Sequence, residues 1–260
     1  MERRQFIRVC AAGAGNARAA TAASTLTHTG TLGAGAAVIA SAAALVTSGS
    51  VAAAPVQAKR YPRARLIMAG GAPLKAAHLA VNKNYVFFYP FQGTPVFLLN
   101  LGKALKPAPT KGFDGADYEW PGGAGAAKSI VAYSAICSHQ LTYPTKDISF
   151  ISFRAGKSGA NKHADVIHCC SEHSQYDPAA GAKVLAGPAP QPLAAVLLEH
   201  DAKTDELYAT GTLGGEMFNA FFRKYEMKLT LDMGGRARHA AGDACAVTEL
   251  DNYCRQQVRC

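Results

Sequence analysis

Charged residues are missing from one long stretch of this chain, because no Lys, Arg, Asp or Glu occurs between Arg18 and Lys59. Two further absences narrow the function. No Cys-x-x-Cys-His segment occurs, which argues against covalent attachment of a c-type haem. No basic run alternates with aromatic residues, so the net charge of +9 does not indicate a nucleic-acid partner. The basic charge instead favours docking to an acidic protein or to anionic lipid.

The uncharged stretch follows a pair of arginines. Residues 2–8, Glu-Arg-Arg-Gln-Phe-Ile-Arg, closely resemble a twin-arginine export motif, and residues 32–54 form an Ala/Gly-rich apolar segment. Residues 52–54 and 56–58 each offer a small-residue cleavage site. However, about twenty apolar residues can also span a bilayer. We expect a retained membrane anchor, with the rest of the chain at the periplasmic face of the bacterial inner membrane.

Two short segments offer metal ligands: Cys137-Ser138-His139 and Cys170-Ser171-Glu172-His173. Each supplies one thiolate and one imidazole. A closed tetrahedral zinc site uses such a set, and so does a [2Fe–2S] cluster with both thiolates on one iron and both imidazoles on the other. We expect the adjacent His168 and Cys169 to be strand residues that lead into the second segment.

Residues downstream of the second segment favour the cluster. Tyr176-Asp177 follows it closely, and residues 187–190 read Gly-Pro-Ala-Pro. A CxH segment, a CxxH segment, an aromatic-Asp pair and a Gly-Pro-x-Pro loop, in this order, resemble the Rieske iron–sulfur protein family. The resemblance covers residues 128–200 most closely.

This resemblance implies one Rieske [2Fe–2S] cluster per chain. The metal ligands would be Cys137, His139, Cys170 and His173. Ser174 and Tyr176 would be hydroxyl donors to the cluster, while Gly187, Pro188 and Pro190 would belong to a loop that shields it from solvent.

The match also shows departures. Rieske proteins of cytochrome bc complexes usually carry one further cysteine in each ligand loop, and a disulfide joins the two. Thr142 and Glu172 stand at the matching positions here, so that bridge is absent. Thirty residues, 140–169, separate the two segments, and 154–162 read as an exposed excursion between strands. Four cysteines outside the ligand set and the leader would permit two disulfides: Cys169, Cys245, Cys254 and Cys260.

The pattern after residue 60 predicts an all-β fold. Short apolar or alternating runs separated by turn residues occur at 65–69, 85–89, 95–99, 129–132, 148–153, 165–168, 194–199 and 206–209. Residues 216–225 alone have a helix-like apolar face, for which we expect a role in core packing. Residues 102–127 read as a long surface loop.

The resemblance adds an architecture, an antiparallel β domain with an inserted cluster-binding subdomain. We therefore expect a leader or transmembrane helix at 1–58 and a Rieske domain at 59–232, whose cluster-binding part is 134–193. A Cys-bearing tail at 233–260 would be an oxidised cap on the domain or a docking segment.

The function implied is one-electron transfer, with His139 and His173 as the catalytic imidazoles. Exposed at the surface, they would accept a quinol's proton while iron accepts its electron, and a c-type cytochrome would receive the electron.

The leading hypothesis is the Rieske subunit of a respiratory quinol–cytochrome c oxidoreductase, with b-type and c-type cytochrome partners. The second is the small subunit of a periplasmic molybdenum enzyme of the arsenite-oxidase type, partnered by a molybdopterin subunit, because such subunits can lack the cluster disulfide. The third is a zinc-stapled binding module without enzymatic activity.

Overall fold

The computed structural model describes residues 57–112, 115–160 and 162–260. The export motif and the apolar segment predicted before residue 55 lie outside this range. Within it, no helix has the length and apolarity needed to cross a bilayer.

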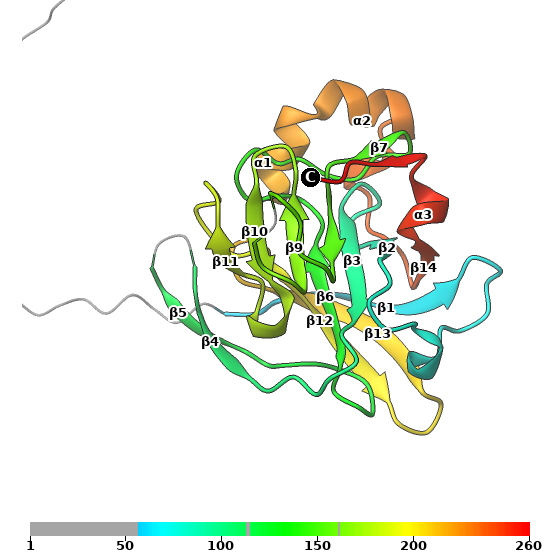
Figure 1. Ribbon diagram of the computed structural model, residues 1–260. Helices are drawn as coiled ribbons and strands as arrows, with labels where there is room; N and C mark the ends of the chain where they lie inside the picture. The colour runs from blue at the N-terminus through cyan, green and yellow to red at the C-terminus, as the bar shows by residue number, and fades with distance from the viewer. Residues whose placement is uncertain (1–56, 113–114, 161) are drawn as a thin grey trace, which may run out of the picture. The chain divides into compact units, whose positions relative to one another are not determined.

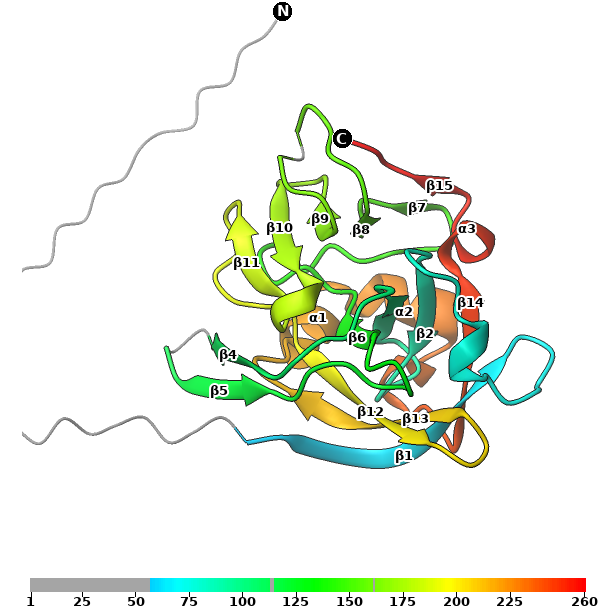
Figure 2. The ribbon, with the colours of Figure 1, turned by 60° about the horizontal axis from the view of Figure 1, so that its bottom comes forward.

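Seven strands close a barrel, in the order β1-β13-β12-β6-β3-β2-β14 (Figures 1 and 2). Closure gives every barrel strand a neighbour on both sides. All neighbours run antiparallel except β1 and β14, which are parallel. The barrel strands are β1 (Lys59–Met68), β2 (Tyr85–Phe88), β3 (Pro95–Asn100), β6 (Ile130–Ser134), β12 (Ala195–Asp201), β13 (Glu206–Leu213) and β14 (Ala244–Glu249).

A second sheet is inserted between β6 and β12. Its four antiparallel strands lie in the order β11-β10-β9-β8. They are β8 (Ile151–Arg154), β9 (Val166–Cys169), β10 (Ser174–Asp177) and β11 (Lys183–Ala186). Two small sheets flank it, one of β7 (Ile148–Ser149) with β15 (Gln256–Gln257), the other of β4 (Ala108–Lys111) with β5 (Asp117–Trp120). The structure thus confirms the all-β class with an inserted sheet, apart from the parallel β1–β14 pair.

Barrel and inserted sheet share one hydrophobic core. Side chains alternate between the two faces of a strand, and both faces of β3 are buried. Phe97 and Leu99 pack with Ile151, Phe153 and residues of β9 and β10 from the inserted sheet. Val96 and Leu98, on the other face of β3, pack in a second hydrophobic cluster inside the barrel, together with side chains of β1, β2 and β13. This two-sided burial fixes the inserted sheet against the barrel, and with it the ligand segments.

All eight predicted strand runs coincide with strands, and the helix predicted at 216–225 is α1 (Phe218–Lys224). Its apolar face, Phe218, Phe221 and Phe222, packs on Ile136 and Leu141, which flank the first ligand segment. Residues 154–160 contain the expected exposed excursion. The sequence pattern did not predict α2 (Glu226–Met233), α3 (Leu250–Tyr253), the β4–β5 hairpin inside the expected loop, or the strands β10, β11, β14 and β15.

The segment after residue 232 is part of the barrel rather than a separate tail. β14 hydrogen-bonds to β1 on one side and to β2 on the other, so it closes the barrel. β15 then pairs in parallel with β7, next to the inserted sheet. This segment therefore links the barrel to the part of the molecule that carries the ligand residues.

Candidate metal centre

The first ligand segment follows β6 in a tight turn. The Cys137 amide donates to the Thr142 carbonyl at 2.8 Å, and the Leu141 amide donates to the Cys137 carbonyl at 2.9 Å. Leu141 has a left-handed φ of 61° and is buried under α1. The turn leaves the Cys137 thiol buried in the shared core, whereas His139 is half-buried at the turn.

The second ligand segment is the connection between β9 and β10. Cys169 is the last residue of β9, and its backbone pairs with Ser174 at the start of β10. The four residues between them make the turn, in which His173 has a left-handed φ of 58°. Ser171, Glu172 and His173 are exposed. The hairpin thus has a buried cysteine at the end of β9 and an exposed histidine in its turn.

The thiols of Cys137 and Cys169 are neighbours. Both cysteines are free and fully buried, and both belong to the core cluster that contains Tyr176. The Cys169 thiol as donor, assisted by Tyr176, lowers the pKa of Cys137 to about 6 although burial opposes the shift. The same interaction with Cys137 and burial raise the pKa of Cys169. The pair is therefore set to hold negative charge on Cys137.

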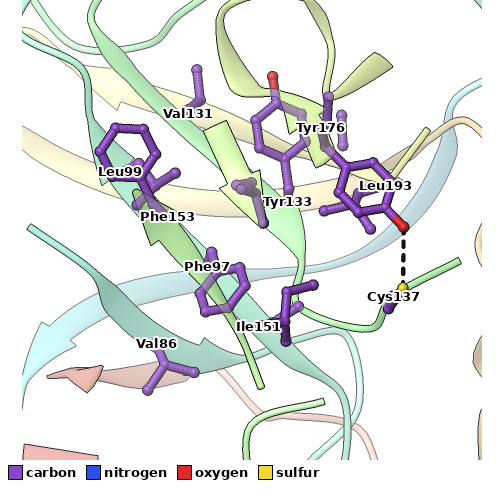
Figure 3. Close-up of a cluster of buried hydrophobic side chains, with 14 of the residues drawn as sticks. Val86, Phe97, Leu99, Val131, Tyr133, Cys137, Ile151, Phe153, Tyr176 and Leu193 are labelled. Atoms are coloured by element: carbon purple, nitrogen blue, oxygen red, sulfur yellow. Dashed lines mark hydrogen bonds between the residues drawn. The ribbon is translucent and has the colours of Figure 1, made fainter. Parts of the chain in front are cut away.

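Tyr176 of β10 supports this pair from inside the core. Its hydroxyl lies 3.2 Å from the Cys137 Sγ (Figure 3). The Ser138 amide donates to the same hydroxyl oxygen, also at 3.2 Å. Burial and the nearby Cys137 charge raise the pKa of Tyr176, so the phenol keeps its proton and can donate it to sulfur. Hydrogen bonds of this kind stabilise thiolate ligands.

Two buried polar atoms beside the thiol pair have no hydrogen-bond partner among the described residues. They are the His139 Nδ1 and the Ser174 Oγ. Each is close in sequence or in strand pairing to one of the two thiols. Buried polar atoms without partners are uncommon in folded proteins and call for an explanation. A metal ligand role for the imidazole and a hydrogen bond from the hydroxyl to a bound group would supply one.

The Gly-Pro-Ala-Pro loop lies against the hairpin. A Cβ built on Gly187, whose φ is 86°, would come within 2.5 Å of the His173 carbonyl oxygen, so only glycine allows this approach. The Ser138 Oγ donates to the Gln191 carbonyl at 2.6 Å, which joins the loop to the first ligand segment. Pro188 and Pro190 are exposed on its outer side.

The structure corrects the predicted ligand set at one position. Cys170 is not a free thiol beside Cys137, because it forms a disulfide with Cys260. A sulfur in a disulfide bond is no thiolate and cannot bind iron as one. The thiol beside Cys137 belongs to Cys169, which the Cys-x-x-His spacing had excluded. The prediction that Cys169, Cys245, Cys254 and Cys260 pair with one another is wrong, because Cys260 bonds to Cys170 and the other three are free.

His168 and His173 lie together on the other side of the hairpin. Their ring centroids are 5.7 Å apart. The His168 Nδ1 is 3.5 Å from the Cys260 Sγ. In the described part of the chain, His168, Cys170 and Cys260 form the one group of three or more metal-ligating side chains whose ligand atoms all lie within 4.8 Å of each other. The four predicted ligands are therefore not gathered around a single point.

No family model matches the chain. The soluble domain of the Rieske protein II (soxF) from Sulfolobus acidocaldarius is similar in structure, with 25% sequence identity over 60% of this chain and 82% of that one, and a TM-score of 0.44. A likeness of this size does not establish a shared function, which depends on the side chains at the ends of β6 and β9.

Proposed function

We propose that this protein carries single electrons through a Rieske-type [2Fe–2S] cluster. The observation that supports it most directly is the buried pair of free thiols, Cys137 and Cys169, with the Tyr176 hydroxyl on one sulfur. One cysteine follows β6 and the other ends β9, and the hydrophobic core of barrel and inserted sheet surrounds both. Paired thiolates in an apolar setting suit iron held in a cluster.

The residues fit a two-iron cluster better than a single zinc ion. A structural zinc site draws four ligands into one tetrahedron. A Rieske cluster instead distributes thiolates and imidazoles over two irons, so the imidazoles need not approach the thiols closely. The buried, unpartnered His139 Nδ1 is a donor for the second iron, and His173 at the exposed turn is the candidate for the other imidazole position.

When bound, such a cluster accepts and releases one electron at a potential that its ligands and hydrogen bonds determine. The chain's own residues would set that environment. The Tyr176 hydroxyl lies 3.2 Å from the Cys137 sulfur, and the buried Ser174 hydroxyl at the start of the same strand has no partner among the described residues. The Gly187 loop covers the hairpin. With His139 half-buried and His173 exposed, the imidazole side would face a redox partner.

For the physiological role we propose a subunit of a respiratory quinol–cytochrome c oxidoreductase at the periplasmic face of the inner membrane. The exposed prolines next to the candidate imidazoles support it, as a surface against which a quinol-binding protein can dock. The predicted N-terminal anchor supports it as well. A histidine ligand at the surface can take up a proton as iron takes up an electron.

One observation favours the alternative, the small subunit of a molybdenum enzyme of the arsenite-oxidase type. No disulfide connects the two ligand loops among the described residues, since the bridge from the hairpin runs to Cys260 instead. Such small subunits can lack a bridge between the loops.

Spectroscopy of the full-length protein tests the cluster. We expect two iron and two sulfide per chain and, after reduction, the EPR signal of a [2Fe–2S] cluster with mixed histidine and cysteine ligands. Stoichiometric zinc without iron would refute the proposal and favour the zinc-stapled module. Purification from native membranes then separates the two complexes, because b-type haem or a molybdopterin subunit would accompany the protein.

A further inference from the structure

We infer that Cys169, not Cys170, is the second thiolate ligand, and that Cys170 instead fastens residues 255–260 to the ligand hairpin through its disulfide with Cys260. The inference deepens the proposed function and rests on it. It concerns two adjacent cysteines whose sulfurs lie in different environments.

Strand alternation accounts for the separation of the two sulfurs. Adjacent side chains of a strand point to opposite faces. Ile167 and Cys169 of β9 belong to the same core cluster as Cys137 and Tyr176. Their cross-strand neighbours are Tyr176 and Ser174 respectively. One face of the β9–β10 hairpin therefore carries the Cys169 thiol, the unpartnered Ser174 hydroxyl and the Tyr176 phenol. Cys137 packs in the same core cluster as Cys169 and Tyr176.

Cys170 belongs to the opposite side. His168 faces away from the shared core, and its ring contacts the Cys260 sulfur. The Cys170 amide donates to the Phe150 carbonyl at 2.6 Å, which fixes the first turn residue over the strand next to β9. In this position its sulfur reaches Cys260 and not Cys137.

Residues 255–260 are bound along their length, so the disulfide completes an existing contact. β15 pairs with β7, and the Val258 amide donates to the Ser149 carbonyl at 2.8 Å. The Arg154 guanidinium donates to the Val258 carbonyl, and the Ser158 hydroxyl to the Cys260 carbonyl. The segment runs beside β7 in both views (Figures 1 and 2). We refer to residues 255–260 as the strap.

The strap gives the hairpin a covalent restraint that the ligand loops do not give each other. Thr142 of the first loop cannot form a bridge, and no cysteine other than Cys170 occurs in the turn 170–173. With Cys170 linked to Cys260, the start of this turn is tied to a segment that β7 already holds. The ligand hairpin is thus restrained from its outer side, and both core thiols stay free for iron.

Chemical analysis of the native, cluster-loaded protein tests the assignment without mutation. Free thiols are alkylated under denaturing conditions without reductant, the protein is digested, and the Cys170–Cys260 linked peptide is quantified beside iron and sulfide in the same sample. We expect full cluster occupancy together with the full yield of linked peptide, and alkylated Cys137 and Cys169. Cluster-loaded protein with alkylated Cys170 and Cys260 would overturn the inference.

A matched pair of variants provides the second test. Cys169→Ser should lose iron, sulfide and the EPR signal but retain the linked peptide. Cys170→Ser should lose the linked peptide and retain the cluster at the wild-type ratio of iron to protein, and Cys260→Ser should behave like it. Circular dichroism establishes that each variant is folded. If Cys169→Ser does not fold, the linked-peptide analysis of the wild type still decides.

The opposite pattern, a cluster lost with Cys170→Ser and kept with Cys169→Ser, would refute the ligand assignment while upholding the proposed function. A wild-type protein that holds zinc or no metal would refute the proposed function itself. The two failures are therefore distinguishable in the same set of samples.

Discussion

The Tyr176 hydroxyl lies 3.2 Å from the Cys137 Sγ, and it joins the two ligand loops through a single side chain. Tyr176 stands on β10, whereas Cys137 follows β6, so the contact spans the inserted sheet and the barrel. The phenol is fully buried and accepts the Ser138 amide hydrogen as well. It is therefore held in position to donate to sulfur.

Tyr176→Phe should lower the reduction potential of the cluster without removing it. A hydrogen bond to a thiolate spreads its negative charge and so favours the reduced cluster, which is the more negative state. If the bond is stronger in the reduced state by about 1.4 kcal/mol, its loss shifts a one-electron potential by about 60 mV. Protein-film voltammetry measures the shift.

Tyr133→Phe is the matched control for that prediction. Tyr133 is as deeply buried as Tyr176, but its hydroxyl donates to the Pro178 carbonyl at 2.8 Å and not to a thiol. The same chemical change there should leave the potential unchanged. An equal shift in both variants would mean that the effect arises from packing and not from the bond to sulfur.

Substitutions at Glu172 and His173 test which residue is the fourth ligand of the cluster. If Cys169 is the thiolate, Glu172 follows it by three positions and His173 by four, so the spacing alone does not decide between them. Both side chains are exposed, and we expect neither substitution to affect folding. His173→Ala should abolish the Rieske-type EPR signal because an imidazole ligand is lost, whereas Glu172→Gln should preserve it.

His163→Ala controls for the loss of an exposed histidine elsewhere, since His163 lies on the excursion before β9. It should leave iron content and EPR signal as in the wild type. The proposal for His173 fails if its alanine variant keeps the signal and Glu172→Gln loses it, which would assign a carboxylate to the second iron.

In the second ligand segment, local spacing selected Cys170 rather than the adjacent Cys169. Both faces of β9 are buried. Which of them points to Cys137 depends on the pairing of β9 with β8 and β10 and on packing against β3 and β6, all of which are long-range contacts. The partner of Cys170 lies 90 residues away, so no local pattern could indicate it. In the sequence, only the run of two cysteines, Cys169 and Cys170, indicated that either could be the ligand.

Strands with an apolar or alternating run were predicted, except β11 and β14, whereas the polar strand β10 was not. β10, Ser-Gln-Tyr-Asp, buries three side chains without an apolar run, because its neighbours on both sides are strands. In β14, exposed alanines alternate with the buried Cys245 and Val247. Because the surrounding sequence is polar, this short alternation did not indicate a strand. In β10 and β14 the tertiary context, and not intrinsic propensity, determines the structure.

Gly187→Ala should loosen the proline loop from the hairpin. The new Cβ would lie 2.5 Å from the His173 carbonyl oxygen, and a φ of 86° is unfavourable for alanine. Strain of this kind costs about 1–3 kcal/mol. We expect a lower midpoint of thermal unfolding and faster loss of iron to a chelator.

Gly159→Ala is the control, because a Cβ at Gly159 meets no atom within 4 Å and the residue has no positive φ. This variant should unfold and release iron like the wild type. If Gly187→Ala did the same, the loop would not be in close contact with the hairpin in solution.

Cys260→Ser should destabilise the protein by about 2–4 kcal/mol, the usual contribution of a disulfide that closes a long loop. The Cys170–Cys260 bridge closes a loop with a sequence separation of 90 and restrains the unfolded chain accordingly. Urea unfolding at matched cluster occupancy measures the difference.

Cys254→Ser is the control, since Cys254 is a free thiol near the strap whose Sγ donates to the Gln256 carbonyl, a bond that serine can replace. A mild reductant should bring the wild type to the stability of Cys260→Ser and leave that variant unchanged. Equal stability of wild type and Cys260→Ser without reductant would show that the strap is held by its backbone contacts alone.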